Sequence, residues 1–494
     1  MSLSTLQEVR AGGSAGRTVG LPDDVIERFA ATHPSLRQAI DEAVARFRAL
    51  RESHPDLVAL DERDQIDALQ DGLLNLYPAG AVNPYVALAA RGPWIVTSKG
   101  AVVHDSGGYG MLGFGHGPQA ILDAMARPAV MANVMTASFS MAHFVEALRG
   151  EIGARRDGGC PFERFVCINS GSEAMTMAAR LSDINAKEHT DAGGRHAGRA
   201  VKVIALRGGF HGRTDRPAGF SDSTREAYMK HLASFRGRDD LLTVMPNDVG
   251  QLRRTFARAE RERWFIEALL LEPVMGEGNP GLAIEREFYD VARDLTAQHG
   301  SLLVVDSIQA GLRAHGVLSI VDYPGFEDAL PPDVEAYSKA LNAGQYPLSV
   351  LALSSPSVEL YRHGVYGNTM TTNPRGLDVA TAVLGQITPE VRANIAERGR
   401  ELVAKLKTLA GELDGEIVGV QGTGLLASAE LAPDLPCYGF GSIEERMRLN
   451  GVGVIHGGEN SLRYTPHFAV DSDEIDLIVA ATGEAIRAFR ASVA

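Results

Sequence analysis

Short runs of consecutive apolar residues recur along the middle of this 494-residue chain and alternate with helix-like segments. Such runs are typical of strands buried on both faces of a parallel sheet, because neither face of the strand then meets water. The runs are 165–168, 203–206, 268–271, 302–305 and 348–353. Between the third and fourth runs, apolar residues from Phe288 to Leu295 recur at the spacing of one helix face. The alternation predicts an α/β fold, with a mainly parallel sheet flanked by helices.

The two ends of the chain carry different patterns. In residues 1–93, apolar residues recur at helical spacing in a charged background, which predicts an extension of two amphipathic helices. These residues are Ile40, Ala43, Val44 and Phe47, then Ile66, Leu69, Leu73 and Leu76. After residue 375 the pattern becomes a long helix, short strands and a last helix. We therefore expect an N-terminal extension (1–93), a large domain (94–375), whose first part contributes to the small domain, and a smaller α+β domain (376–494).

Charge and cysteine content exclude several functions. The formal net charge of −14 opposes binding to nucleic acid or to an anionic membrane, because both need clustered basic residues. No apolar stretch reaches the roughly 18 residues of a membrane span, and residues 1–20 lack the pattern of a signal peptide. Cys160, Cys167 and Cys437 have neither a metal-type spacing nor the even number of a disulfide framework. We expect a cytoplasmic protein with no metal site.

The segment after the first apolar run has the features of a phosphate site. Open α/β sheets bind ligands at the carboxyl ends of their strands, and residues 165–168 are followed by Ser170, Gly171 and Ser172 and then by a helix pattern. A helix that begins with glycine and serine offers free N–H groups, a hydroxyl and close backbone approach. Taken alone, the segment also fits an ordinary capped helix.

Two further strand ends carry groups suited to a flat ring that contains nitrogen. Residues 203–206 are followed by Phe210 in a glycine-flanked loop, where its ring could stack on a flat ligand. Residues 302–305 are followed by Asp306, whose buried carboxylate needs a partner such as a protonated ring nitrogen. Ile308 points to the same face of an extended segment. A core phenylalanine, and an aspartate satisfied by loop amides, are the alternatives.

A lysine in apolar surroundings completes the pattern. The chain has only seven lysines against 41 arginines, and Lys339 lies in the mostly apolar stretch 337–341. Burial favours the neutral, nucleophilic form of a lysine amine, which can form a Schiff base with a carbonyl cofactor; a solvated loop lysine is the alternative. A phosphate site, a stacking ring, an acid for a pyridine nitrogen and a Schiff-base lysine together fit pyridoxal phosphate.

With these residues in place, the chain resembles the class III (ornithine and ω-amino acid type) aminotransferases of pyridoxal-phosphate fold type I, from about Trp94 to the C-terminus. The resemblance implies a large domain with a mainly parallel, seven-stranded sheet and a smaller α+β domain. The segments that carry it are Ser-Gly-Ser-Glu-Ala at 170–174, Phe-His-Gly-Arg-Thr at 210–214, Leu-Glu-Pro-Val at 271–274, Asp306 with Gln309 and Gly311, Ser-Lys at 338–339, Gly-Asn-Thr at 367–369 through Asn-Pro at 373–374, and Leu-Arg-Tyr-Thr-Pro at 462–466.

The resemblance implies a role for each cofactor residue. Lys339 would form the Schiff base and then move the proton between substrate and cofactor, and Asp306 would pair with the pyridinium nitrogen. Gln309 would reach the phenolic oxygen, and Phe210 and Ile308 would sandwich the ring. The other implied cofactor-binding positions are Ser170, Gly171, Ser172, His211, Glu272 and Thr369.

The resemblance also implies partners and substrates. Thr369 would reach the phosphate bound by a neighbouring subunit, which implies a homodimer with shared active sites. Arg463 would bind a substrate carboxylate, and Glu277 resembles the family's gating glutamate, which pairs with the arginine when that carboxylate is missing. Tyr109 is a candidate substrate contact. The implied reaction moves an amino group from an amine, ω-amino acid or diamino acid to a keto acid by a ping-pong mechanism.

Three segments near the expected substrate entrance depart from the family pattern. Ser307 stands where a glutamate is common. Leu-Arg-Ala-His at 312–315 replaces the usual aromatic-Gly-Arg-Thr, and Met-Thr-Thr at 370–372 replaces an aromatic followed by small residues. These departures leave the substrate open.

Several alternatives stay in view. Racemases, epimerases and aminomutases share this fold and nearly all its cofactor residues, and differ in whether the amino group leaves on the cofactor. A Gly-x-Gly-x-x-Gly at 108–113 is typical of a dinucleotide-binding dehydrogenase, but no acidic residue follows at about the required 20-residue distance. His211 is a candidate general base beside Lys339. A non-catalytic binding protein on this fold is the last alternative, but such a protein would have no use for Lys339 and Asp306.

Overall fold

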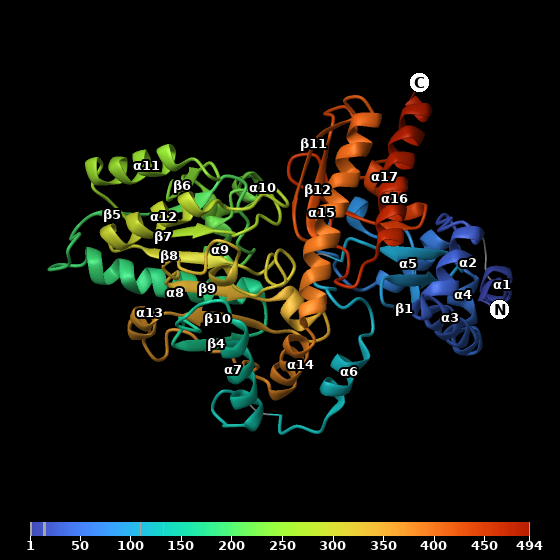
Figure 1. The fold of residues 1–494 in the computed structure, drawn as a ribbon, viewed down its shortest axis with the longest axis horizontal. Coiled ribbons are helices and arrows are strands. Elements are labelled where there is room, and N and C mark those ends of the chain that lie inside the picture. Colours follow the sequence, from blue (N-terminus) through green and yellow to red (C-terminus); the bar gives the residue numbers. More distant parts are fainter. Residues whose placement is uncertain (1, 13–15, 109, 132, 494) are drawn as a thin grey trace. The chain divides into compact units, whose positions relative to one another are not determined.

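The computed structural model describes residues 2–12, 16–108, 110–131 and 133–493 (Figure 1). The chain forms two compact units, both discontinuous in sequence. The terminal unit consists of Met1–Gln119, Glu397–Gln421 and Ala427–Ala494, and the central unit of Ala120–Ala396 and Gly422–Leu426. The sequential division at residues 93 and 375 stays a prediction.

The central unit is built on a sheet of seven strands within the described residues, in the order β4-β10-β9-β8-β7-β5-β6. Neighbours from β9 to β6 are parallel, whereas β10 is antiparallel to β9 and to β4. This confirms the predicted α/β fold with a mainly parallel sheet. The strands are β4 (Arg164–Ile168), β5 (Ala200–Leu206), β6 (Leu241–Val244), β7 (Trp264–Leu271), β8 (Leu302–Asp306), β9 (Val334–Tyr337) and β10 (Ser349–Leu353).

Helices lie on both sides of this sheet (Figure 1), and residues on both of its faces are buried. Helix α8 (Gly171–Thr190) packs in one core with Leu270 and Val304. Because neighbouring strand residues point to opposite faces, Leu271 and Val305 face the other side, where they are buried as well. Two-sided burial explains why these strands appear as unbroken apolar runs. The other helices are α6 (Gln119–Ala126), α7 (Phe139–Glu151), α9 (Asp215–Phe220), α10 (Arg225–His231), α11 (Val249–Arg261), α12 (Arg286–His299), α13 (Ser355–Leu360) and α14 (Pro374–Gly385).

Strand direction brings the predicted site segments to one edge of the sheet. β5, β7, β8 and β9 are parallel, and β4 runs the same way because two antiparallel pairings separate it from β9. The carboxyl ends of these five strands therefore share an edge, where open sheets bind ligands. The segments that follow the strands there are 169–172, 207–213, 272–277, 307–309 and 338–339.

Two four-stranded sheets among the described residues, β1-β2-β3-β13 and β11-β12-β15-β14, lie in the terminal unit except for the residues of β11 and β12 within 422–426, which belong to the central unit. Helix α3 (Pro34–Ser53) contacts β1 and β2, and its predicted apolar face is buried. The strands are β1 (Ala87–Arg91), β2 (Trp94–Thr97), β3 (Val102–Asp105), β11 (Ile417–Thr423), β12 (Leu426–Leu431), β13 (Val452–Gly453), β14 (Ile455–Gly457) and β15 (Ser461–Tyr464). The other helices are α1 (Ser2–Ala11), α2 (Asp23–Thr32), α4 (Pro55–Ala59), α5 (Glu62–Gln70), α16 (Ile443–Leu449) and α17 (Ser472–Val493), and α15 (Pro389–Glu412) contains residues of both units. No helix in the described ranges combines the length and apolar character that crossing a membrane requires.

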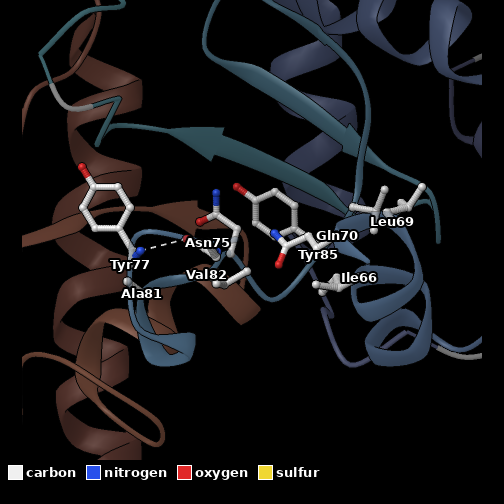
Figure 2. Close-up of a pocket in the computed structure, with 10 residues that line it drawn as sticks. Ile66, Leu69, Gln70, Asn75, Tyr77, Ala81, Val82 and Tyr85 are labelled. Atoms are coloured by element: carbon white, nitrogen blue, oxygen red, sulfur yellow. Dashed lines mark hydrogen bonds between the residues drawn. The ribbon is translucent and has the colours of Figure 1, made fainter. Parts of the chain in front are cut away.

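The second helix predicted in the extension is shorter than its apolar pattern suggested. α5 ends at Gln70, and Gly72 follows with a φ of +80°, a left-handed conformation that ends a helix. Leu73 and Leu76, predicted to lie on the buried face, are 76% and 86% exposed. Figure 2 shows a pocket between α5 and the segment that follows, lined by Ile66, Leu69, Gln70, Asn75, Tyr77, Ala81, Val82, Asn83, Tyr85 and Val86.

A buried cluster of histidines and carboxylates holds the start of α17. Glu474 is 1% exposed; its Oε2 accepts the N–H of Asp471 at 2.9 Å, and its Oε1 lies 3.1 Å from Nε2 of both His104 and His467. His33, between α2 and α3, lies 3.1 Å from Asp471. Burial alone would raise the pKa of Glu474, but the two histidines outweigh it and hold the pKa far below its usual range. The cluster thus joins the extension, β3 and the last helix.

We expect Glu474→Gln to lower the free energy of unfolding by about 3 kcal/mol at pH 7, because an amide cannot replace a carboxylate that accepts from three sides. A carboxyl group whose pKa is lower in the folded than in the unfolded protein stabilises the folded state above its unfolded-state pKa. This stabilisation is lost as the pH falls. The difference between the variant and the wild type should therefore shrink below about pH 4. Urea unfolding across pH measures it. Glu484→Gln, at an exposed position of α17, is the control, and an equal loss in both variants would contradict the assignment.

Candidate active site

Asp306, the last residue of β8, is held in place by two donors. Its side chain is 4% exposed; Oδ2 lies 3.0 Å from Nδ1 of His211, and Oδ1 accepts the N–H of Ile308 at 3.1 Å. Because each oxygen of a carboxylate can accept two hydrogen bonds, each keeps capacity for a further donor. The carboxylate is thus fixed in place and still able to bind a protonated ring nitrogen.

His211 lies behind Asp306 and is buried. Its backbone N–H donates to Oγ of Ser221 at 2.9 Å, and its second ring nitrogen, Nε2, is buried without a hydrogen-bond partner among the described residues. The contact with Asp306 suits a residue that orients the carboxylate. It does not suit the alternative of a general base, which must reach the substrate.

Glu272 connects two of the loops at this edge of the sheet. Its Oε1 accepts the N–H of Phe210 at 3.0 Å, and its Oε2 accepts the N–H of Gly276 at 2.8 Å. Burial raises the pKa of Glu272 to about 7, with His211 opposing the rise and the nearby Asp306 reinforcing it. The carboxyl group therefore holds the loops after β5 and β7 together, beside the acid of β8.

Lys339 reaches back toward the segment that follows β8. It begins a 3₁₀ turn over Lys339–Asn342 with a φ of +49°, a left-handed conformation that is uncommon outside glycine and that recurs at functional sites. Its Nζ donates to Oε1 of Gln309 at 2.8 Å, and Nε2 of Gln309 donates to the carbonyl of Gly276 at 3.3 Å. The structure therefore brings the predicted amine onto the segment that begins with Asp306.

The start of α8 lies against the same segment. A Cβ on Gly171 would come within 2.9 Å of Cδ1 of Ile308, so a larger residue would displace the isoleucine. Ser172 is half-buried in the first turn, and its Oγ lies 3.4 Å from the N–H of Arg213. The Arg213 guanidinium lies 5.3 Å from the ring centroid of Phe210, which is half-buried. The predicted phosphate and stacking segments thus lie on adjoining loops.

Glu173 is a residue of this region that the sequence analysis missed. Its N–H donates to the capping Oγ of Ser170 at 3.3 Å, and its Oε2 accepts the N–H of Asn169 at 3.1 Å. Its Oε1 accepts from Nδ2 of Asn368 at 2.8 Å, which ties the loop 367–369 to the helix start. The Ser-x-x-Glu spacing of a capping box could have identified it.

The other predicted residues occupy separate segments. Thr369 is exposed, and its carbonyl accepts a hydrogen bond from Asn133 at 3.3 Å. Glu277 is half-buried in the loop after β7, and Arg463 is buried on β15 of the terminal unit. Tyr109 lies outside the described residues. The roles expected of these four residues stay predictions.

The glycine-rich segment 108–113 lacks the surroundings of a dinucleotide site. In such a site, the glycine loop joins a strand directly to a helix within a parallel β-α-β unit. Here the loop follows β3, which pairs with β2 in antiparallel fashion, and the next helix, α6, begins only at Gln119. The dehydrogenase alternative is not supported.

The set of groups at the sheet edge fits pyridoxal phosphate. An aldehyde needs a primary amine, which Lys339 provides, and a ring nitrogen needs a fixed carboxylate with spare acceptor capacity, which Asp306 provides. A phosphate needs a helix start that its oxygens can approach closely, as at Gly171. Gln309 and Ile308 connect the three groups through the contacts above. The residues present can therefore hold this cofactor.

Comparison with known proteins identifies relatives over most of the chain. Residues 77–486 match the family model of the class III aminotransferases. The ornithine aminotransferase of Staphylococcus carnosus is 26% identical over 403 residues, which are 80% of this chain and 92% of that protein. The acetylornithine aminotransferase of Xanthomonas campestris is 29% identical over 314 residues, which are 63% of this chain and 71% of that protein.

Solved structures share the fold. The ornithine aminotransferase of Toxoplasma gondii superposes with a TM-score of 0.74 at 20% identity, covering 90% of this chain and 99% of that one. An S-selective transaminase of Bacillus megaterium gives a TM-score of 0.70 at 16% identity, covering 87% of this chain and 98% of that one. At these identities the likeness concerns the fold alone.

Proposed function

Because the chain belongs to the class III aminotransferases, we propose that it moves the amino group of an ω-amine, ω-amino acid or diamino acid to a keto acid, with Lys339 holding the cofactor. The enzyme is a pyridoxal-phosphate-dependent aminotransferase. The observation that best supports the role of Lys339 is the 2.8 Å hydrogen bond from its Nζ to Oε1 of Gln309, on the segment that begins with Asp306. The names of the relatives, ornithine and acetylornithine aminotransferase, favour a donor with a terminal amine.

Transamination is the chemistry of this family. The relatives and the solved structures described above are aminotransferases or transaminases by name. The alternative of a racemase, epimerase or aminomutase on the same fold has no support among them.

The site residues can be given roles around the cofactor. Pyridoxal phosphate, when bound, supplies an aldehyde that takes up the amino group and a ring that withdraws electrons from the substrate carbon. Asp306 would keep the ring nitrogen protonated, because a fixed anion favours the charged form of its partner, and His211 would keep Asp306 from turning away. Lys339, once displaced by the donor amine, would take the proton from the substrate carbon. The same groups would serve both half-reactions, as ping-pong kinetics requires.

Arg463 would bind the carboxylate of a substrate. Its planar guanidinium can hold a carboxylate through two parallel hydrogen bonds. Glutamate and an ω-amino acid carry such a group, whereas a simple amine does not. The gating role of Glu277 and the substrate contact of Tyr109 remain implied by the family resemblance.

We further propose that the enzyme is a homodimer in which Thr369 reaches the phosphate held by the neighbouring subunit. Thr369, Val134 and Met135 line one apolar pocket of the central unit. Val134 is 64% exposed, Met135 83% and the nearby Phe139 84%. Clusters of exposed apolar side chains of this kind mark protein interfaces. A molar mass of a single chain in light scattering at assay concentration would contradict the proposal.

A cytoplasmic location fits the cysteines. Cys160, Cys167 and Cys437 are unpaired. Burial raises the pKa of Cys167 to about 12, as expected of an unreactive core thiol. Unpaired thiols persist in a reducing compartment. Recovery of the enzyme outside the cytoplasmic fraction of cells would refute the location.

We expect Lys339→Ala to lower turnover by about 1,000-fold or more, because the variant lacks both the cofactor's anchor and the group that moves the proton. Retention of non-covalently bound cofactor, measured by absorbance after gel filtration, would show that the pocket is intact. Lys230→Ala, at an exposed lysine of the same unit, is the control and should keep full turnover. Wild-type-like turnover in Lys339→Ala would refute the assignment.

We expect Arg463→Ala to lower kcat/KM about 100-fold for glutamate and other carboxylate-bearing donors, the loss of a charge-assisted pair, with a much smaller effect on a simple amine. Single-turnover conversion of the bound cofactor to its amine form gives both values. Arg487→Ala, at an exposed arginine of α17, controls for general effects. Equal losses with glutamate and with the simple amine would count against the role.

A further inference from the structure

A second buried carboxylate lies beside the cofactor segment. Glu335, on β9, is fully buried. Its Oε1 accepts the Oγ–H of Ser307 at 2.6 Å and the N–H of Ile320 at 3.0 Å, and its Oε2 accepts the Oγ–H of Ser319 at 2.6 Å. One carboxylate therefore joins β9, the residue after Asp306 and the turn that begins at Ser319.

This carboxylate is held by neutral donors. In the described part of the chain, its hydrogen bonds come from two serines and a backbone amide, with no lysine, arginine or histidine in an ion pair with it. The titratable groups that face it are Cys160, Tyr289, Tyr323 and Tyr337. Burial raises the pKa of Glu335 to about 7, and the two serine hydroxyls moderate the rise. Burying an acid without a counter-charge lowers the stability of the fold. Because stability does not explain Glu335, we look to its contacts for a role in positioning.

Ser307 and Glu335 are each connected to the cofactor site along their own stretch of chain. Ser307 is bound to β9 twice, through its hydroxyl to Glu335 and through its N–H to the carbonyl of Ala336 at 3.0 Å. Ser307 lies between Asp306 and Ile308, while β9 ends two residues before Lys339. Since neighbouring residues of an extended segment point to opposite faces, Ser307 and Asp306 face opposite sides of the sheet. Glu335 thus binds the segment 306–309 through Ser307, from the face of the sheet opposite Asp306.

We propose that Glu335 is a positioning residue of the cofactor site, which fixes through Ser307 where Asp306 and Lys339 point relative to each other. The family resemblance implies a glutamate at the position of Ser307, and in this chain the neighbouring strand supplies the carboxylate. Glu335 lies on the side of the sheet opposite Asp306, so its effect on the site passes through the serine. The inference rests on the proposed roles of Asp306 and Lys339.

Measuring the affinity for the cofactor distinguishes a positioning role of Glu335 from a general effect on protein stability. We expect Glu335→Gln to bind pyridoxal phosphate about tenfold more weakly in a titration of the apoenzyme, the loss of one buried hydrogen bond. The absorbance of the bound cofactor should also change its dependence on pH. Glu267→Gln is the matched control, because Glu267 is a buried glutamate of β7 that accepts from Ser182 and Arg216. It should lower the melting temperature and leave cofactor affinity and absorbance unchanged.

An exchange of the two side chains tests the contact itself. Glu335→Ser alone should bind the cofactor at least as weakly as Glu335→Gln, whereas Ser307→Glu combined with Glu335→Ser returns the carboxylate from the other strand. We expect the double variant to recover affinity to within about threefold of wild type. Wild-type affinity and absorbance in Glu335→Gln, a loss matching that of Glu267→Gln, or an exchange no better than Glu335→Ser alone would each overturn the proposal.

Asp306→Asn, measured in the same series, distinguishes this inference from the function on which it rests. Altered absorbance in Asp306→Asn with an unaltered Glu335→Gln would leave the role of Asp306 standing and reject that of Glu335. Unaltered cofactor binding in both variants would reject both roles.

Discussion

The hydrogen bond between His211 and Asp306 fixes the point around which the site is arranged. A carboxylate at the end of a buried strand has few ways to be satisfied, and here one oxygen is held by the histidine and the other by the N–H of Ile308. Its orientation is therefore set before any ligand arrives. Gln309 follows three residues later on the same segment and binds the amine of Lys339. The acid and the amine are thus placed by one short stretch of chain.

That stretch depends in turn on buried carboxylates that do not face the site. Glu272 holds the loops after β5 and β7 by their backbone amides, beside His211 and Asp306. Glu335 binds Ser307 from the other side of the sheet. Preorganisation of this kind lets a site meet its cofactor without first reordering its own groups. The common edge of the strands brings the site residues close together, and the buried carboxylates fix their orientation.

Much of the fold and the site was predictable from the sequence, because the constraints there are local. The strands that carry the site are buried on both faces, so β7 and β8 appear as unbroken apolar runs. Asp306 and Gly171 follow two of the apolar runs, so parallel strand direction was enough to predict a common edge for them, whereas Lys339 was picked out by its apolar surroundings and by the family resemblance. Their roles in binding the cofactor stay predictions. The capping role of Glu173 was also visible as a spacing, although it was missed.

Other features had no local signal. Strand β9 was missed because Glu335 interrupts its apolar pattern, and its partner Ser307 approaches from another strand. The apolar spacing of Leu73 and Leu76 suggested a longer helix, which a turn at Gly72 ends. The contact of His211 with Asp306 joins residues 95 positions apart. Long-range pairings of this kind depend on packing, which the periodicity of one segment does not encode.

The proposed mechanism requires that the cofactor is bound through the amine of Lys339. Borohydride reduction of the holoenzyme followed by peptide mass mapping tests it directly, because reduction makes the bond between cofactor and lysine permanent. The chain offers seven lysines. We expect the pyridoxyl group on Lys339. Its presence on any of the other six lysines, or its absence from every lysine of a fully loaded enzyme, would contradict this assignment.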